Sequence, residues 1–125
     1  MTQIPQSADL AIAAIQQQCS ADKDTSLATS ERLIRQAATD GAQLVVLQEL
    51  HATLYFCQTE DTSVFELAEP IPGPTSRRLS ALAAELGIVL VGSIFERRMN
   101  GVYHNTAVVF ERDGTIAGLY RKMHI

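Results

Sequence analysis

Apolar residues along the chain form two kinds of pattern, continuous runs and runs with helical spacing. Continuous runs occupy residues 10–17, 43–48 and 88–95, and the last two are typical of strands buried on both faces. Between them, residues 25–40 and 75–86 carry apolar side chains at helical spacing, and Gly41 or Gly87 follows at the position of a helix cap. The pattern predicts strands alternating with two amphipathic helices.

The C-terminal third is predicted to be an antiparallel meander. Asn100-Gly101 and Asp113-Gly114 are turn dipeptides, and strand-like runs follow them at residues 104–111 and 115–121. Upstream, residues 49–74 are too long for an ordinary link between elements, which is typical of a functional loop or a lid. The predicted order is β-α-β, loop, α-β-β-β, and the fold class is α/β.

Length and charge narrow the possible partners. The 125 residues are 46% hydrophobic, which suits one domain over residues 1–125. The formal net charge is −4 without a basic run, so we expect no nucleic-acid partner. No apolar stretch reaches the roughly 18 residues of a membrane span, and residues 1–8 lack the features of a signal peptide. We therefore expect a soluble cytoplasmic protein without a membrane partner.

No pattern in the sequence predicts a metal or a cofactor. His51, His104 and His124 lie in different segments without the spacing of metal ligands. Cys19 and Cys57 also lack such spacing, and in the cytoplasm they should stay reduced. No glycine-rich phosphate-binding pattern follows a predicted strand. We expect neither a metal nor a cofactor.

Two charged residues stand at the ends of predicted strands. Glu49 follows the apolar run at residues 44–47, and ligands of open α/β sheets bind beyond such strand ends, which makes Glu49 a candidate general base. Lys122 ends the last predicted strand beside a second cation, Arg121. On position alone, a solvated carboxylate and a surface lysine are the simpler interpretations.

Four segments, in order, resemble the nitrilase superfamily of carbon–nitrogen hydrolases. LVVLQEL at residues 44–50, with YFCQ at 55–58, is similar to the block that holds the general-base glutamate of that family. YRKMHI at residues 120–125 is similar to the block that holds its lysine. LAEPIPGPT at residues 67–75 and YHNTAV at 103–108 look like stretches of the N-carbamoylputrescine amidases. The matches extend over nearly the whole chain.

The resemblance implies the N-terminal half of a four-layer α-β-β-α sandwich and a hydrolase with a Glu–Lys–Cys triad. Glu49 would take the proton of a cysteine thiol, the thiolate would form a thioester with the substrate, and Lys122 would stabilise the oxyanion and donate a proton. In the family the nucleophilic cysteine follows a later strand, so we expect it to be absent from residues 1–125. The implied substrate is a small N-carbamoyl amine, N-carbamoylputrescine, which yields putrescine, ammonia and carbon dioxide.

Two alternatives remain open at this stage. The substrate would be an N-carbamoyl-β-amino acid if the chain resembled the ureidopropionases more closely. Alternatively, the chain would be a non-catalytic remnant or an interaction module. In either case, half of a sandwich exposes apolar sheet surface, so we expect a homo-oligomer.

The remaining candidates belong to the loop and to the two cysteines. Cys57 aligns with a loop cysteine of the amidases, so we predict a structural or substrate-lining role for it, and Cys19 is interpreted as a small buried or turn residue. Acidic residues outnumber basic ones in the loop and would attract a substrate ammonium group: Glu60, Asp61, Glu66 and Glu69. Each of them is also interpretable as a solvated loop charge.

Overall fold

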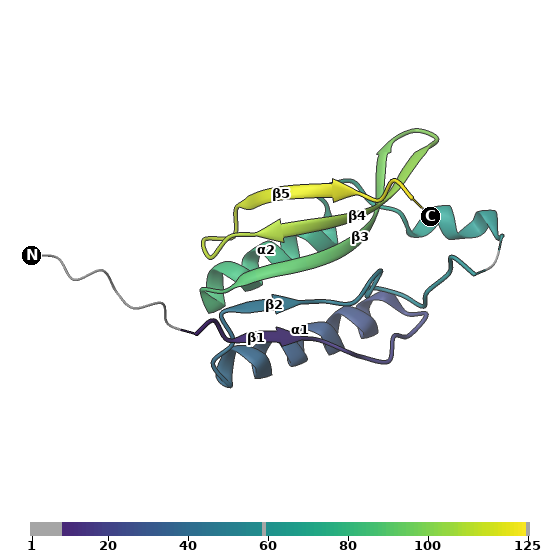
Figure 1. Ribbon diagram of the computed structural model, residues 1–125. Helices are drawn as coiled ribbons and strands as arrows, with labels where there is room; N and C mark the ends of the chain where they lie inside the picture. The colour runs from purple at the N-terminus through teal and green to yellow at the C-terminus, as the bar shows by residue number, and fades with distance from the viewer. Residues whose placement is uncertain (1–8, 59, 125) are drawn as a thin grey trace, which may run out of the picture.

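The computed structural model describes residues 9–58 and 60–124, which form a five-stranded sheet with two helices packed on one face (Figure 1). In chain order the elements are β1 (Ile12–Ala14), α1 (Lys23–Thr39), β2 (Leu44–Val46), the 3-10 helix η1 (Thr62–Leu67), α2 (Pro74–Leu86), β3 (Val89–Met99), β4 (Val102–Phe110) and β5 (Ile116–Arg121). The sheet order follows the chain, with β1, β2 and β3 parallel and β4 and β5 antiparallel. The predicted α/β class and the C-terminal meander are confirmed.

The strands at either end of the parallel part differ in length from the prediction. The apolar run predicts a strand over residues 10–17, but β1 pairs with β2 over only three residues. Gln17 N–H then donates to the Gln48 side chain at 2.8 Å instead of to a backbone carbonyl, so the ladder ends. In contrast, β3 continues past the predicted end at Phe95 to Met99, because it pairs with β4 up to the turn at Gly101, whose φ is 76°.

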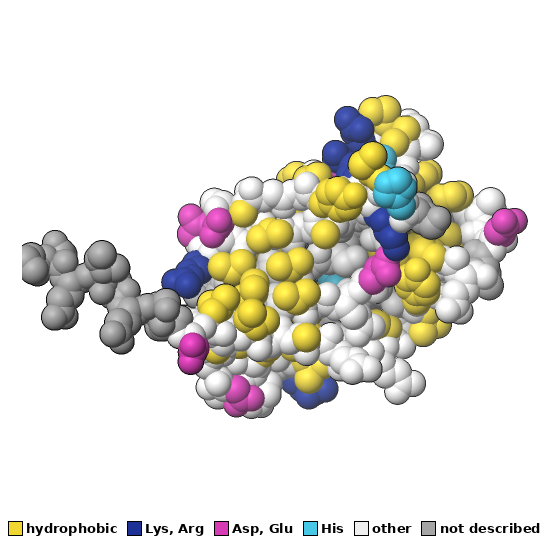
Figure 2. Space-filling model, viewed as in Figure 1, with side chains coloured by type: hydrophobic (Ala, Val, Ile, Leu, Met, Phe, Trp, Pro, Cys, Tyr) yellow, Lys and Arg dark blue, Asp and Glu magenta, His cyan; other side chains and the backbone are white. Residues whose placement is uncertain are grey.

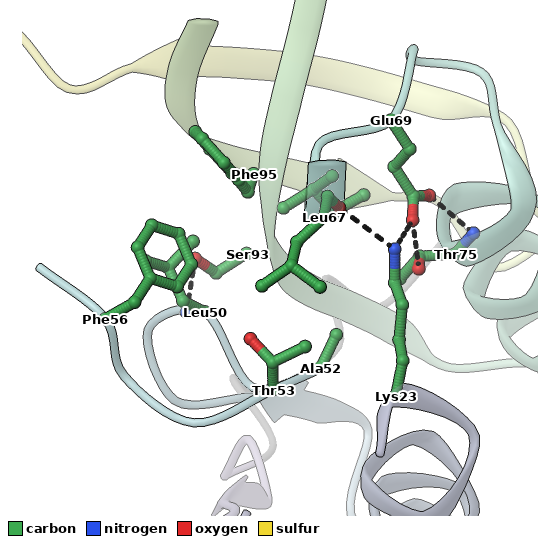
Figure 3. A pocket seen from close by; sticks show the side chains of 11 residues that line it. Lys23, Leu50, Ala52, Thr53, Phe56, Leu67, Glu69, Thr75, Ser93 and Phe95 are labelled. Carbon is green, nitrogen blue, oxygen red and sulfur yellow. Dashed lines mark hydrogen bonds and ion pairs between the residues drawn. The ribbon is translucent and has the colours of Figure 1, made fainter. Parts of the chain in front are cut away.

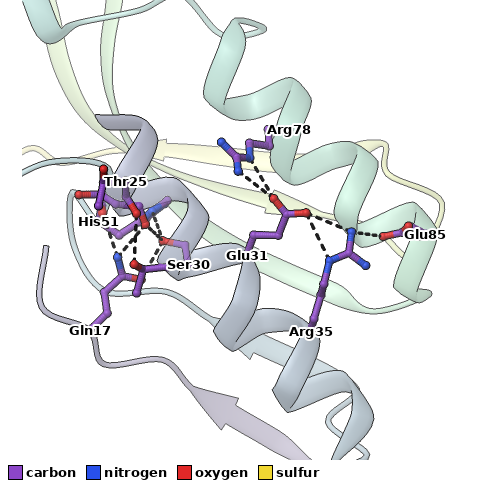
Figure 4. Close-up of polar contacts among 10 residues, drawn as sticks. Gln17, Thr25, Ser30, Glu31, Arg35, His51, Arg78 and Glu85 are labelled. Carbon is purple, nitrogen blue, oxygen red and sulfur yellow. Dashed lines mark hydrogen bonds and ion pairs between the residues drawn. The ribbon is translucent and has the colours of Figure 1, made fainter. Parts of the chain in front are cut away.

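The core lies between the helices and the sheet. Ile34 of α1 and Leu79 of α2 are buried against Leu90 and Phe110 of the sheet. The two helices are also joined on their outer side, where Arg78 donates to Glu31 at 2.8 Å and Arg35 lies 2.6 Å from Glu85 (Figure 4). Both predicted helices therefore bury one stripe, as their spacing indicates.

The opposite face of the sheet is covered by none of the described elements. Ile12 is 60% exposed and Tyr120 is 59% exposed, and Figure 2 shows hydrophobic side chains gathered over the strands on this face. Leu44 and Val46 are only partly buried. The prediction that the runs at residues 43–48 and 88–95 are buried on both faces is therefore wrong for the described chain. The runs are apolar on both faces, but helices cover only one of them.

The long loop follows the carboxyl ends of the strands and packs through aromatic rings. Phe56 lies 4.8 Å from Phe95 between ring centroids, and Phe65 of η1 stacks on Tyr103 at 4.4 Å. The loop then joins the sheet, because Glu69 N–H donates to Phe95 O at 3.0 Å.

Within the described residues, no helix is long and apolar enough to cross a membrane.

Candidate active site

Glu49 lies on a turn that carries the chain from β2 across β3. Leu50, the next residue, has a φ of 51°, which is uncommon for a residue with a branched side chain. Its N–H donates to Ser93 Oγ at 2.9 Å, and its side chain is buried. Surrounding contacts therefore hold a backbone conformation that would otherwise be unfavourable. The turn leaves the Glu49 side chain on the uncovered face of the sheet.

Lys122 lies on the same face of the sheet and follows β5, the strand at its edge. Its N–H donates to Asn105 O at 2.9 Å, which extends the β4–β5 pairing by one residue. Its Nζ lies 2.8 Å from Glu49 Oε1. The two charges therefore meet although the strands that lead to them are not neighbours, because β3 and β4 lie between β2 and β5. The turn after β2 spans this gap.

Asn105 completes the contacts of the Glu49 carboxylate. Its Nδ2 donates to Glu49 Oε1 at 2.6 Å, so the same oxygen accepts from both Asn105 and Lys122. Ser93 Oγ lies 3.5 Å from Asn105 Oδ1 and orients the amide. Among the described residues, Glu49 Oε2 has no hydrogen-bond partner. The sequence analysis includes Asn105 in a matched segment but assigns it no role, because an asparagine within a strand carries no signal of its own.

The contacts fix the charge states of both groups. The hydrogen bond from Lys122 is the main cause that lowers the pKa of Glu49, and the bond from Asn105 adds to it. The same pair raises the pKa of Lys122. At neutral pH the site therefore holds a carboxylate and an ammonium group. Both side chains remain accessible, with 42% of Glu49 and 39% of Lys122 exposed.

The ion pair borders an open hollow of about 330 Å³ on the uncovered face. Apolar residues of three strands and the β2 end form most of its floor: Leu47, Val91, Gly92, Ala107 and Tyr120. A space of this size accommodates a small molecule. The hollow therefore combines an apolar floor with one fixed pair of opposite charges.

The two cysteines lie in different surroundings, with Cys57 exposed and Cys19 partly buried. Cys57 is exposed in the loop, and its hydrogen bond with Tyr55 is the main cause that raises the pKa of that phenol. Cys19 donates to His51 O at 3.2 Å and accepts from Gln48 Nε2 at 3.3 Å. Burial raises the pKa of Cys19, which keeps its thiol protonated and unreactive.

A second, smaller pocket is lined in part by the loop, and here the structure corrects one expectation (Figure 3). Glu69 does not face solvent as a steering charge: it is 5% exposed, forms an ion pair with Lys23, and accepts from Thr75 N–H at 2.6 Å. Asp61 caps the start of η1, where its side chain accepts a hydrogen bond from Ser63 N–H. The pocket beside Glu69 has a volume of about 20 Å³, which suits a single water-sized molecule. It is too small for a substrate.

His51, two residues after Glu49, is fully buried in a polar network of the loop and α1 (Figure 4). Its Nδ1 lies 3.3 Å from Ser30 Oγ, its backbone oxygen accepts from Gln17 Nε2 at 3.5 Å, and its Nε2 has no partner in the described chain. Burial lowers the pKa of His51 from 6.5 to about 4, and the negative charge of Glu69 opposes this shift only in part. At neutral pH His51 is therefore uncharged in the folded protein.

Acidification is expected to destabilise the fold through His51. Between pH 6.5 and about 4 the unfolded chain binds a proton at this residue and the folded chain does not, so this stability is present above pH 6.5 and is lost as the pH falls. From pH 7 to pH 5 the loss should be about 2 kcal/mol. Urea unfolding at both pH values measures it. His51→Gln should remove most of the difference, whereas His124→Gln, at an exposed position, should not. If His51→Gln lost as much stability between pH 7 and pH 5 as the parent chain, the loss would not arise from His51.

Metal binding has no support in this region, because no three His, Cys, Asp or Glu residues of the described chain are grouped closely enough to hold an ion.

Comparison with known proteins assigns the family. The sequence profile of the carbon–nitrogen hydrolases matches residues 11–125. The chain belongs to the carbon–nitrogen hydrolase family. It is 45% identical over 115 residues to the N-carbamoylputrescine amidase of Solanum lycopersicum, covering 91% of this chain and 38% of that protein. It is 37% identical over 119 residues to the citrullinase of Francisella tularensis, covering 94% of this chain and 41% of that protein.

The solved structures agree with this assignment. The crystal structure of a carbon–nitrogen hydrolase from Helicobacter pylori G27 superposes with a TM-score of 0.85 at 42% identity and covers 90% of this chain and 39% of that chain. This carbon–nitrogen hydrolase chain therefore spans about two fifths of the length of the relatives it matches.

Proposed function

We infer that the chain supplies the base and the oxyanion-stabilising cation of a carbon–nitrogen hydrolase, with a cysteine contributed by a part of the enzyme beyond residues 1–125. The contact of Lys122 and Asn105 with one oxygen of Glu49 carries this proposal. It joins a carboxylate and a fixed cation at the edge of a hollow large enough for a small substrate. Nucleophilic hydrolysis of an amide requires both groups.

The proposed mechanism has two half-reactions, formation of a thioester and its hydrolysis. Glu49 takes the thiol proton, and the thiolate attacks the substrate carbonyl while Lys122 stabilises the charge that develops on oxygen. The carbon–nitrogen bond then breaks as the leaving nitrogen takes the proton held by Glu49, so a thioester remains and Glu49 is again a carboxylate. Water activated by Glu49 cleaves the thioester and releases the cysteine.

This chemistry needs the uncovered face of the sheet to be closed. A cation stabilises an oxyanion best where water is excluded, whereas Glu49 and Lys122 are both about two fifths exposed. Covering the face would also raise the pKa of Glu49 by desolvation, against the lowering effect of Lys122, and would make it a better base for a thiol. The exposed apolar strands make this face the surface on which the rest of the enzyme, or a second copy in a homo-oligomer, would pack.

The proposed substrate is N-carbamoylputrescine, which places the reaction in the formation of putrescine, a polyamine, in the cytoplasm. The relatives named N-carbamoylputrescine amidase support this choice, with 45% identity for the tomato protein. Glu60 and Glu66 of the loop remain available to attract an ammonium group, while Glu69 is paired. The competing substrate, an N-carbamoyl-β-amino acid, finds less support, because the loop at residues 49–74 contains no lysine or arginine to bind its carboxylate.

Ammonia release from two substrates tests this function. The chain joined to the C-terminal remainder of a close relative should release ammonia faster from N-carbamoylputrescine than from N-carbamoyl-β-alanine at matched concentrations. Faster release from N-carbamoyl-β-alanine would contradict this substrate and indicate a substrate like that of the ureidopropionases. Residues 1–125 alone are the negative control and should release none. Steady release that Cys57→Ser abolishes would show that Cys57 is a nucleophile after all.

A further inference from the structure

The strand that leads to Lys122 has little packing of its own. β5 has a single neighbour, β4, in the described sheet. Its first five residues are all exposed, and only its last residue, Arg121, is partly covered. An edge strand with so few buried contacts opens easily at its end. Something other than apolar packing must therefore hold the position from which Lys122 reaches Glu49.

Arg121 supplies this contact through a buried carboxylate. Its Nε donates to Glu96 Oε1 at 2.7 Å and its Nη2 donates to Glu96 Oε2 at 2.9 Å, a two-pronged pair. The Glu96 side chain is only 4% exposed. Thr106 Oγ1 donates to the same carboxylate at 2.9 Å. The cluster thus ties together β3, β4 and β5, the strands of Glu96, Thr106 and Arg121.

The pair and the candidate active site lie on opposite faces of the sheet. Arg121 and Lys122 are consecutive, and successive side chains of a strand point to opposite faces. Arg121 is opposite Thr106 in the β4–β5 register, and Lys122 N–H is bonded to Asn105 O. The register that brings Arg121 to Glu96 therefore also brings Lys122 and Asn105 to Glu49. A slip by one residue would exchange the faces of the two cations.

We propose that Glu96 and Arg121 are a positioning pair that holds Lys122 Nζ on Glu49 from the opposite face of the sheet. The proposal rests on the proposed function of Lys122 as the oxyanion-stabilising cation. An arginine is required at position 121 because its planar fork meets both carboxylate oxygens at once, which a lysine ammonium does not. The hydrogen bonds of Arg121 are also the main cause that lowers the pKa of Glu96, so the pair stays charged at neutral pH.

The test is Arg121→Lys in the 125-residue chain, which keeps the charge but removes the fork. The pKa of the Glu49 carboxyl group, measured by carbon-13 NMR, should rise at least half of the way to its value in Lys122→Met. Amide hydrogen exchange at Lys122 should accelerate at least tenfold, on the order expected for local opening of a strand end. Exchange at Ile34 and Leu82 in the core should stay as in the parent chain. Arg112→Lys, in the exposed β4–β5 turn, is the matched control and should change neither readout.

An unchanged pKa of Glu49 and unchanged exchange at Lys122 in Arg121→Lys would overturn the proposal. If that variant does not fold, the double variant Glu96→Gln with Arg121→Gln removes both charges together and leaves no buried charge unpaired. The same two readouts then decide. Global unfolding of both variants would also overturn the proposal, because the pair would then hold the whole fold. Neither readout requires hydrolysis, so failure of the proposed function would leave this result intact.

Discussion

Replacing Glu49 with glutamine is expected to lower kcat of the hydrolase, completed with the C-terminal remainder of a close relative, by about 10²–10⁴-fold, the usual contribution of a general base. The amide oxygen of glutamine still accepts from Lys122 and Asn105, so the geometry of the site should persist. It no longer takes a proton from a thiol. The rate of ammonia release under saturating substrate measures the effect.

The matched control for this variant is Glu111→Gln, which changes an exposed carboxylate of the β4–β5 turn. It should leave kcat close to the parent value. Urea unfolding of Glu49→Gln should show a stability near that of the parent, because the pair with Lys122 is exposed. An unchanged kcat in Glu49→Gln would remove this residue from the role of base.

Truncating Ile34 to alanine should cost about 2–5 kcal/mol of the free energy of unfolding, the range for a fully buried aliphatic side chain. Ile34 is 0% exposed between α1 and the sheet. Ile12→Ala makes the same change on the uncovered face, where the side chain is 60% exposed, and should cost below about 1 kcal/mol. Urea unfolding of the 125-residue chain compares the two.

Equal losses in the two variants would contradict the description of an uncovered face. Burial of Ile12 in solution by a second copy of the chain would produce such losses. Repeating the measurement over a range of protein concentrations separates this case, since stability that arises from association depends on concentration.

Helices and the meander could be predicted from the sequence because local signals determine them. The spacing of apolar residues and the caps at Gly41 and Gly87 define both helices, and turn dipeptides define the antiparallel strands. The failures concern contacts between distant segments. A continuous apolar run does not reveal whether one or both strand faces are covered, and an acidic loop residue such as Glu69 does not reveal a buried partner like Lys23.

The candidate site likewise has residues that could be predicted from the sequence and residues that could not. Glu49 and Lys122 were predicted from motif resemblance, since their positions alone favour plain surface charges. Asn105 and the left-handed backbone of Leu50 could not be predicted, because both depend on how the turn after β2 crosses β3 to reach β4. The sequence indicates which groups carry charge, whereas their mutual orientation depends on tertiary contacts.

The contacts of Glu49 make the two oxygens of its carboxylate inequivalent. Lys122 and Asn105 both bond Oε1, so that oxygen carries the electrostatic contacts and Oε2 retains lone pairs free of any described donor. Rotation about the Cγ–Cδ bond that exchanged the two oxygens would break both hydrogen bonds at once. Each atom therefore keeps its own task, and a thiol brought to this edge of the sheet meets a base whose proton-accepting oxygen is already selected.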